Sequence, residues 1–331
     1  ITQLNHLPHF RYTGQNTGQW RGSVMRDDVR ETWYRQRRAL EQGHHFSTPD
    51  GLVRHPRFGH ISPAMFLASG LLQLSGLYGR GRSNAMAVSL KPITVHLKNL
   101  PGVFDGYRIL QISDPHLDLV PELAGRIAAL VTNIQADLLL LTGDYRDRHD
   151  TPVEPGLALL EPILGAIEAP DGHYAILGNH DPADAVPILE AMGLNVLINQ
   201  TVAIVRDDAT VHLTGLDDVH YFYTKQARNA LEADIQGCRI AAVHSAEVAD
   251  IAAAAGIDLY LCGHTHGGQI RLPWGPPPIN NLRRCRAYGH GMWRHEQMIG
   301  HTTSGAGVTT IPVRYNCPPE ITLITLRQQD Q

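Results

Sequence analysis

The sequence predicts an α/β fold, and two observations carry that prediction. Through the middle of the chain, short apolar runs of strand length alternate with segments of helical periodicity. Directly after five of the apolar runs stand residues of the types that bind metal ions. With 331 residues, 43% of them hydrophobic, the chain is long enough for one large α/β domain and an appendage.

The elements follow one another regularly. The predicted strands are 107–112, 137–142, 173–177, 239–243 and 257–262. The predicted helices are 121–134, 154–167, 183–192, 225–233 and 246–254. Residues 269–326 contain more Gly, Pro and β-branched residues than helix signals, so we expect further strands there.

Five polar segments stand at or just past the ends of the strands. In chain order they are SDPH at 113–116, GDYRD at 143–147, GNHD at 178–181, VH at 243–244 and GHTHGGQ at 263–269. They supply carboxylate, imidazole and amide groups, which suit a pair of divalent ions. Ligand sites of layered α/β proteins gather at the carboxyl ends of strands, so we expect the five segments to converge.

The order and content of these segments resemble the calcineurin-like metallophosphoesterases, whose pattern is D-x-H, G-D-x-x-D, G-N-H-[DE], an isolated His and G-H-x-H. The resemblance covers roughly residues 84–331. The runs GHTHGGQIRLP and PPEITLITL look closest to a bacterial branch that contains membrane-associated phosphodiesterases and UDP-2,3-diacylglucosamine pyrophosphatases. The resemblance implies a four-layer α/β/β/α sandwich with the metal ions at one edge of the stacked sheets.

The resemblance also implies a role for each motif residue. One metal ion would take Asp114, His116 and His266, the other would take Asn179, His244 and His264, and Asp144 would bridge the two. The two divalent ions, Mn, Fe or Zn, would share a hydroxide that acts as the nucleophile. His180 would be the general acid, with its imidazole oriented by Asp147.

Three further expectations concern single residues. Pro115, in the variable position of D-x-H, should bias Asp114 toward an extended conformation without blocking ligation. Asp217 and Asp218 are expected to hold a turn. The four cysteines lack C-x-x-C spacing, which excludes a zinc ribbon or a thioredoxin-type motif.

The N-terminal extension, residues 1–83, is not explained by the motifs and is expected to be mainly helical. Through residue 60 it carries nine Arg, no Lys and five acidic residues, a net charge of +4, whereas the rest of the chain carries −8. An apolar stretch then predicts an amphipathic helix around 62–79, lying in a membrane interface or facing the substrate. A helix packed on its own domain and a membrane span are the alternatives. A cleavable signal peptide is not expected, because the apolar run begins some sixty residues into the chain.

The sequence therefore predicts a dinuclear-metal hydrolase of phosphoester or pyrophosphate bonds. The leading hypothesis is a lipid-linked substrate such as UDP-2,3-diacylglucosamine. The enzyme would meet it by peripheral contact at the cytoplasmic face of a bacterial membrane. A phospholipid or general phosphodiesterase is the alternative. A nuclease is less favoured, and no nucleic acid partner is expected, because the catalytic portion is net acidic. A non-catalytic binding module is less favoured because none of the seven ligands is missing.

Overall fold

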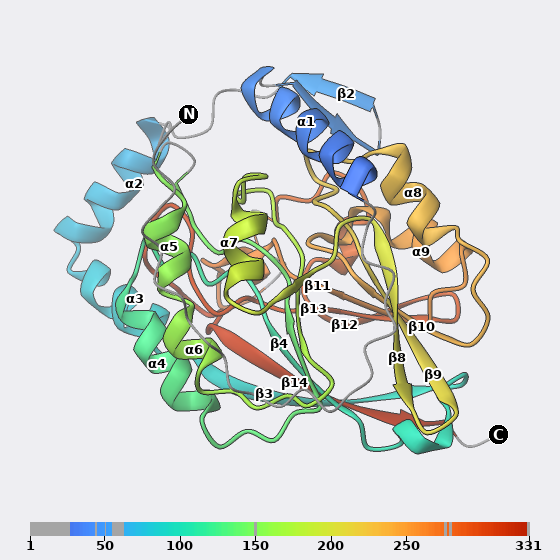
Figure 1. Cartoon of the computed structure of the whole chain (residues 1–331). Helices are drawn as coiled ribbons and strands as arrows, with labels where there is room; N and C mark the ends of the chain where they lie inside the picture. Colours follow the sequence, from blue (N-terminus) through green and yellow to red (C-terminus); the bar gives the residue numbers. More distant parts are fainter. Residues whose placement is uncertain are drawn as a thin grey trace.

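Two six-stranded sheets form the centre of the computed structural model, which describes residues 27–43, 45–49, 51–54, 63–148, 151–274, 277 and 280–329 (Figure 1). The first sheet has the order β3 (Ser89–Leu97), β14 (Glu320–Gln328), β4 (Arg108–Ile112), β5 (Leu138–Leu141), β6 (His173–Ala175) and β7 (Asn195–Val196). The second has the order β12 (Gly291–His295), β13 (Met298–Thr302), β11 (Leu259–Cys262), β10 (Cys238–Ala242), β9 (Ala209–Gly215) and β8 (Gln200–Arg206). In both sheets the strands that precede the polar motifs pair in parallel.

Strand β5 shows how the layers are built. Leu138 and Leu140 pack into the core between the two sheets, whereas Leu139 and Leu141 face the helices on the outer side. Such a strand is apolar throughout because both faces of its sheet are covered. The predicted four-layer α/β/β/α arrangement is confirmed.

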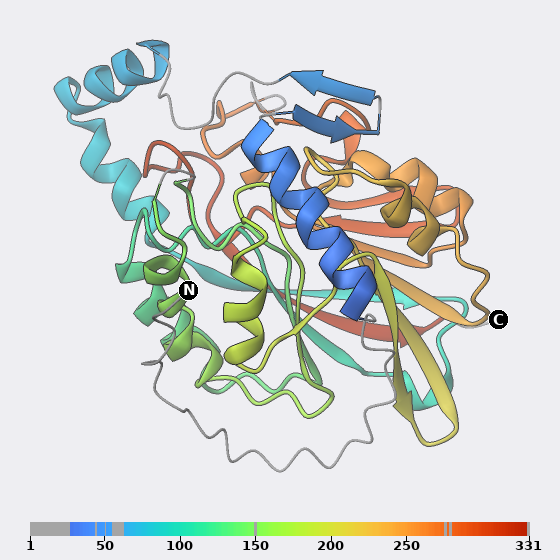
Figure 2. The same ribbon diagram turned by 45° about the horizontal axis from the view of Figure 1, so that its top comes forward.

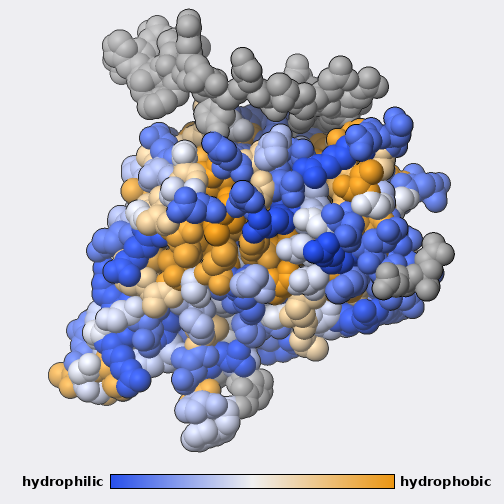
Figure 3. Space-filling view, turned by 90° about the horizontal axis from the view of Figure 1, so that it is seen from below, coloured by the Kyte–Doolittle hydropathy of each residue, from blue (hydrophilic) through white to orange (hydrophobic). Residues whose placement is uncertain are grey.

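Helices cover the outer face of each sheet (Figure 1). Those on the first sheet are α4 (Glu122–Val131), α5 (Glu154–Ala158), α6 (Glu161–Leu164) and α7 (Ala185–Ala191). Those on the second are α8 (Lys225–Leu231) and α9 (Ala249–Ala254). Short 3₁₀ turns are η1 (Gly102–Phe104), η2 (Ala246–Val248), η3 (His266–Gly268) and η4 (Arg286–Tyr288). Seen from below, hydrophilic residues surround a central area where apolar residues are visible (Figure 3).

Three helices predicted as continuous are divided. The segment 246–254 forms the 3₁₀ turn η2 followed by α9. The segment 154–167 forms α5 and α6, because Pro162 in the first turn of α6 lacks the N–H that a continuous helix would need. The segment 62–79 forms α2 (Pro63–Leu74) and α3 (Leu77–Ala85), separated at Gly76, whose φ of 72° is left-handed.

The N-terminal extension is partly a β structure. After α1 (Asp27–Gly43), strands β1 (His45–Thr48) and β2 (Gly51–Arg54) pair as an antiparallel hairpin that the sequence did not suggest. The boundary expected after residue 83 falls inside α3. The first part of the Arg-rich stretch lies outside the described residues. In the described part of the chain, no helix combines the length and the apolar character needed to cross a bilayer.

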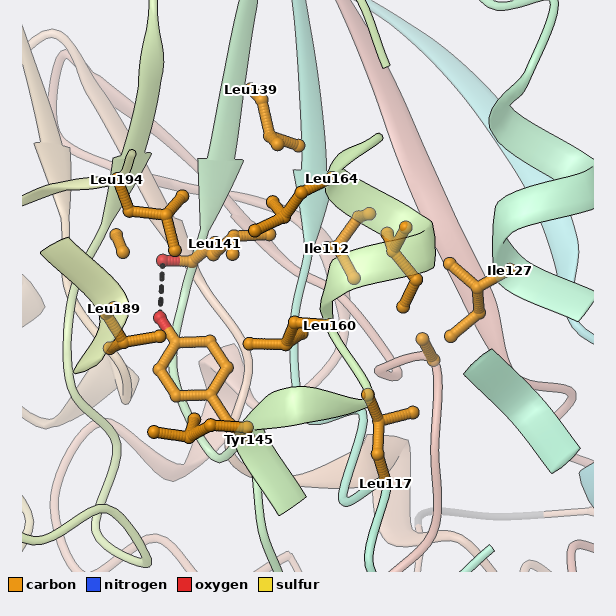
Figure 4. Close-up of a cluster of buried hydrophobic side chains, with 14 of the residues drawn as sticks. Ile112, Leu117, Ile127, Leu139, Leu141, Tyr145, Leu160, Leu164, Leu189 and Leu194 are labelled. Atoms are coloured by element: carbon orange, nitrogen blue, oxygen red, sulfur yellow. Dashed lines mark hydrogen bonds between the residues drawn. The ribbon is translucent and has the colours of Figure 1, made fainter. Parts of the chain in front are cut away.

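Buried side chains of the first sheet and its helices form a continuous apolar cluster (Figure 4). Leu160 is fully buried at its centre, beside Leu164 and Leu141. Tyr145 also enters this cluster, and its hydroxyl donates a hydrogen bond of 2.7 Å to the Ile176 carbonyl. The cluster thus lies directly beneath the loop that carries Asp144.

Replacing Leu160 with Ala should lower the free energy of unfolding by about 2–5 kcal/mol, because the surrounding side chains cannot fill the cavity. Denaturant titration followed by circular dichroism measures this loss. The matched control is Leu74→Ala, where the side chain is 87% exposed and the change should stay within about 0.5 kcal/mol. Equal losses for the two variants would contradict this description of the core.

Candidate metal centre

The polar loops that follow β4, β5, β6, β10 and β11 meet at one edge of the two sheets. Parallel pairing aligns the ends of these strands, so that residues far apart in the sequence become neighbours. The structure brings together the side chains of all seven residues expected to bind metal ions: Asp114, His116, Asp144, Asn179, His244, His264 and His266.

Three of these side chains form a first cluster. The Nε2 atoms of His116 and His266 lie 3.1 Å apart, and His266 Nε2 lies 3.4 Å from Asp114 Oδ1. All three residues are buried. Three ligating atoms pointing at one small volume are what a single cation requires.

A second cluster lies beside the first. His244 Nε2 is 3.2 Å from Asp144 Oδ2, and Asn179 Oδ1 lies 3.1 Å from His244 Nε2 and 2.8 Å from His264 Nδ1. The same Asp144 Oδ2 atom is 3.7 Å from His116 Nε2 in the first cluster. Asp144 therefore stands between the two clusters, where one carboxylate could serve two cations.

Neighbouring carbonyl groups fix which imidazole nitrogens carry protons. His116 Nδ1 donates to the Arg146 carbonyl at 2.8 Å, and His244 Nδ1 donates to the Thr142 carbonyl at 2.7 Å. In the neutral form of each ring, Nε2 then carries a lone pair directed into the clusters. Close approach of such lone pairs to carboxylate and amide oxygens is stabilised by a cation between them, so the residues fit a dinuclear centre.

The charges of the site also favour cations. Burial lowers the pKa of His264 and His266 well below the usual value, which keeps both rings neutral. Burial alone would raise the pKa of the Asp144 carboxyl, but the imidazoles of His244 and His180 hold it well below its usual range. The site thus offers the neutral imidazoles of His264 and His266 beside an ionised carboxylate, which in turn raises the pKa of His244 well above its usual value.

The backbone of these loops adopts an uncommon conformation. Asp114, His116, Asp144, His264 and His266 all have positive φ, between 40° and 70°. Non-glycine residues seldom adopt this region, and such residues cluster at functional sites.

The expected extended conformation of Asp114 was wrong, since its φ is 52°. The physical reason is the contacts around the residue. Its N–H donates to the Gly143 carbonyl at 3.0 Å, and its carboxylate accepts from the His264 N–H. These contacts overcome the local bias that Pro115 imposes.

His180 lies at the rim of the site and is half-buried. Its Nε2 is 4.0 Å from Asp144 Oδ2, and its Nδ1 contacts the backbone carbonyl of Asp147 at 2.6 Å. The Asp147 carboxylate instead accepts a hydrogen bond of 2.6 Å from the Thr309 hydroxyl. The hydrogen bond between His180 and Asp147 thus involves the Asp147 main chain, while the Asp147 carboxylate also lies within 4.8 Å of a His180 ring nitrogen.

Two buried residues support the loops although the sequence did not single them out. The Asp181 carboxylate accepts from the N–H groups of Asp144, Tyr145 and Gly178 at 2.7–3.0 Å. Its position as the last residue of the G-N-H-[DE] motif was a signal that could have indicated this role. The Arg314 guanidinium donates to several carbonyls, including that of Ser304 at 2.6 Å, and no motif marks it.

Comparisons with known proteins agree with this geometry. The profile of the family described as calcineurin-like phosphoesterase matches residues 107–268. An uncharacterized metallophosphoesterase of Bacillus subtilis, YkuE, is 30% identical over 79% of this chain and 93% of its own length. The phosphodiesterase YaeI of Escherichia coli is 28% identical over 66% of this chain and 82% of its own length. A zebrafish (Danio rerio) protein named as a transmembrane protein with a metallophosphoesterase domain is 27% identical over 71% of this chain and 56% of its own length.

Proposed function

Because this chain belongs to the calcineurin-like phosphoesterase family, we propose that it hydrolyses phosphoester or pyrophosphate bonds with two divalent metal ions. The observation that carries the proposal is the position of Asp144, whose Oδ2 atom lies within 4 Å of imidazoles from both clusters. The donor set of imidazole, carboxylate and amide suits Mn, Fe or Zn.

Two bound cations would supply an acidified water as nucleophile and would polarise the phosphoryl oxygens. The protein itself would supply the general acid that protonates the leaving group. His180, held by the Asp147 carbonyl and facing Asp144, would donate a proton from Nε2 to the leaving oxygen. The seven ligand side chains would hold the cations. Buried hydrogen bonds, such as those of His116 and His244 to main-chain carbonyls, keep ligand rings in place for this role.

A lipid-linked substrate, UDP-2,3-diacylglucosamine or one of similar chemistry, is the finer part of the proposal. Exposed apolar side chains on two segments support it. On α2 and just after it, Leu71, Leu74 and Leu77 are 58%, 87% and 44% exposed. In the loop after the last metal motif, Leu272 and Trp274 are 61% and 76% exposed. Large exposed apolar side chains are typical of surfaces that contact lipid or protein.

Tyr315 connects these two groups of side chains. Its hydroxyl donates to the Leu77 carbonyl, and its backbone pairs with Ile270, four residues after His266. Tyr315 therefore joins the start of α3 to the loop that begins four residues after His266. We define Leu71, Leu74, Leu77, Leu272 and Trp274 as the apolar rim, and propose that it makes peripheral contact with the acyl region of a membrane.

The rim should matter for a lipid-linked pyrophosphate and not for a soluble diester. In the Leu71→Ser/Leu74→Ser variant, kcat/KM for the diacyl sugar nucleotide in vesicles should fall at least about tenfold relative to bis-p-nitrophenyl phosphate, since burying one leucine contributes about 1.5–3 kcal/mol. The control is Val205→Ser, which removes an exposed apolar side chain on β8. An unchanged ratio would rule out the lipid-linked substrate. It would favour a soluble phosphodiester, the substrate class that the relative named a phosphodiesterase suggests.

A further inference from the structure

The N-terminal helix α1 is packed against the loops of the metal centre, although it lies outside the region that the family profile matches. Figure 2 shows α1 alongside α7, and an ion pair of 2.5 Å between Arg30 and Glu190 joins the two helices. On its inner face Trp33 is 7% and Arg37 is 2% exposed. Charged side chains are seldom buried to this extent unless they are paired, so the contacts of Arg37 carry information about its role.

Arg37 makes three hydrogen bonds and one ring contact. Its guanidinium donates to the Asp217 carboxylate, to the Asp181 carbonyl at 2.7 Å and to the Glu41 carboxylate at 3.0 Å. It also lies 3.3 Å from the centre of the Phe222 ring. A planar fork of donors suits this set of partners, which a lysine ammonium could not satisfy at the same time.

The first route from Arg37 to the metal centre runs through Asp181. The Arg37 bond fixes the main chain of this residue, and the Asp181 side chain accepts from the N–H groups of Asp144 and Gly178. Gly178 directly precedes Asn179. Asp181 thereby ties the loop of the bridging carboxylate to the loop that carries a ligand of the second cluster.

The second route runs through Asp217. Its carboxylate accepts from the Trp33 indole at 2.7 Å and from the Asp218 N–H at 2.8 Å. The Asp218 carboxylate in turn accepts from the His220 N–H at 3.1 Å, which gives the turn expected for this pair. The His220 ring packs on the His264 ring with 4.3 Å between ring centres.

Beyond the shared Asp144, both routes end on residues of the second cluster alone. The first reaches the loop of Asn179, and the second reaches the ring of His264. We propose that Arg37 is a positioning residue for the metal ion of the second cluster. Helix α1 would thus help to hold the ligands of that ion in place. This inference rests on the two-metal function proposed above. The first cluster has supports of its own, since Arg314 donates to the His266 carbonyl at 3.2 Å and the Arg146 carbonyl accepts from His116 Nδ1.

The test measures Mn²⁺ binding to the full chain by equilibrium dialysis with metal analysis. Wild-type protein should bind two Mn²⁺ ions per chain. Outer-shell partners of metal ligands change metal affinity by about 10- to 100-fold, and Arg37 acts through one further residue. Arg37→Met should therefore weaken binding of the Mn²⁺ ion in the second cluster about tenfold. The affinity of the ion in the first cluster should stay within about threefold of the wild-type value. Arg30→Met is the matched control: it removes an ion pair of the same helix and should change neither affinity.

Retention of both affinities in Arg37→Met, or equal weakening of both, would overturn the inference. Should that variant fail to fold, Trp33→Phe keeps a buried ring while removing the donor to Asp217, and it should weaken the second site selectively. Electron paramagnetic resonance of the Mn²⁺-loaded protein gives an independent reading, because a coupled pair of ions should give way to a single-ion spectrum. A wild-type chain that binds only one Mn²⁺ would contradict the two-metal function itself, which separates the two failures.

Discussion

Replacing Asp144 with Asn should lower kcat/KM for bis-p-nitrophenyl phosphate by about 10³-fold or more. The carboxylate is the group that both clusters share, and it carries the negative charge that would offset two cations. Losing several kcal/mol of charge stabilisation in the transition state corresponds to a rate loss of this size. Asn keeps the shape and can still accept from the His180 N–H, which contacts Oδ1 at 2.9 Å in the native chain.

Metal content separates this effect from misfolding. The Asp144→Asn protein should retain its thermal unfolding transition while binding fewer than two Mn²⁺ ions per chain. Asp234→Asn is the matched control, because this exposed residue contacts only its neighbour Gln236 among the hydrogen bonds described for its side chain. An Asp144→Asn protein with native turnover and two bound ions would show that Asp144 does not bridge them.

Replacing His180 with Gln should lower kcat by about 10²–10⁴-fold for a substrate with a poor leaving group, while two metal ions stay bound. The reason is its position, since His180 faces Asp144 Oδ2 from the rim and is held by the Asp147 carbonyl. A general acid matters most when the leaving oxygen is strongly basic. The loss should therefore be much smaller for a p-nitrophenyl ester than for an alkyl ester.

A series of aryl and alkyl diesters measures this dependence. Log kcat of the His180→Gln protein should fall more steeply with the pKa of the leaving alcohol than that of the wild type. His173→Gln is the matched control, because this imidazole lies on β6 at the far end of the strand from the site. Parallel lines for wild type and His180→Gln would contradict proton donation by His180.

The layers and the convergence of the site could be predicted because both depend on local patterns. Apolar runs such as 137–142 identify strands buried on both faces, and parallel pairing forces the residues that follow them to share an edge. Asp144 and His244 therefore come together without any knowledge of loop conformation.

The loop conformations could not be predicted, because long-range contacts outweigh local preference. Asp114 adopts a positive φ against the bias of Pro115, since its N–H and carboxylate bind the loops that carry Gly143 and His264. Asp147 contacts His180 through its carbonyl, and a sequence motif cannot distinguish main chain from side chain.

Sequence patterns also could not predict that α1 packs against the loops of the metal centre. Arg37 and Asp217 are separated by 180 positions, and each is charged, a type that is usually exposed. By contrast, the division of the apolar segment at Gly76 has a local cause that the sequence does contain.

The central claim is that two metal ions drive phosphoester hydrolysis, and titration of chelator-stripped protein with Mn²⁺ tests it most directly. Turnover of bis-p-nitrophenyl phosphate should be absent at the start, should stay low while the first equivalent binds, and should rise to its maximum as the second equivalent per chain is bound. Full turnover by the stripped protein, or a maximum reached at one equivalent, would contradict the two-metal account.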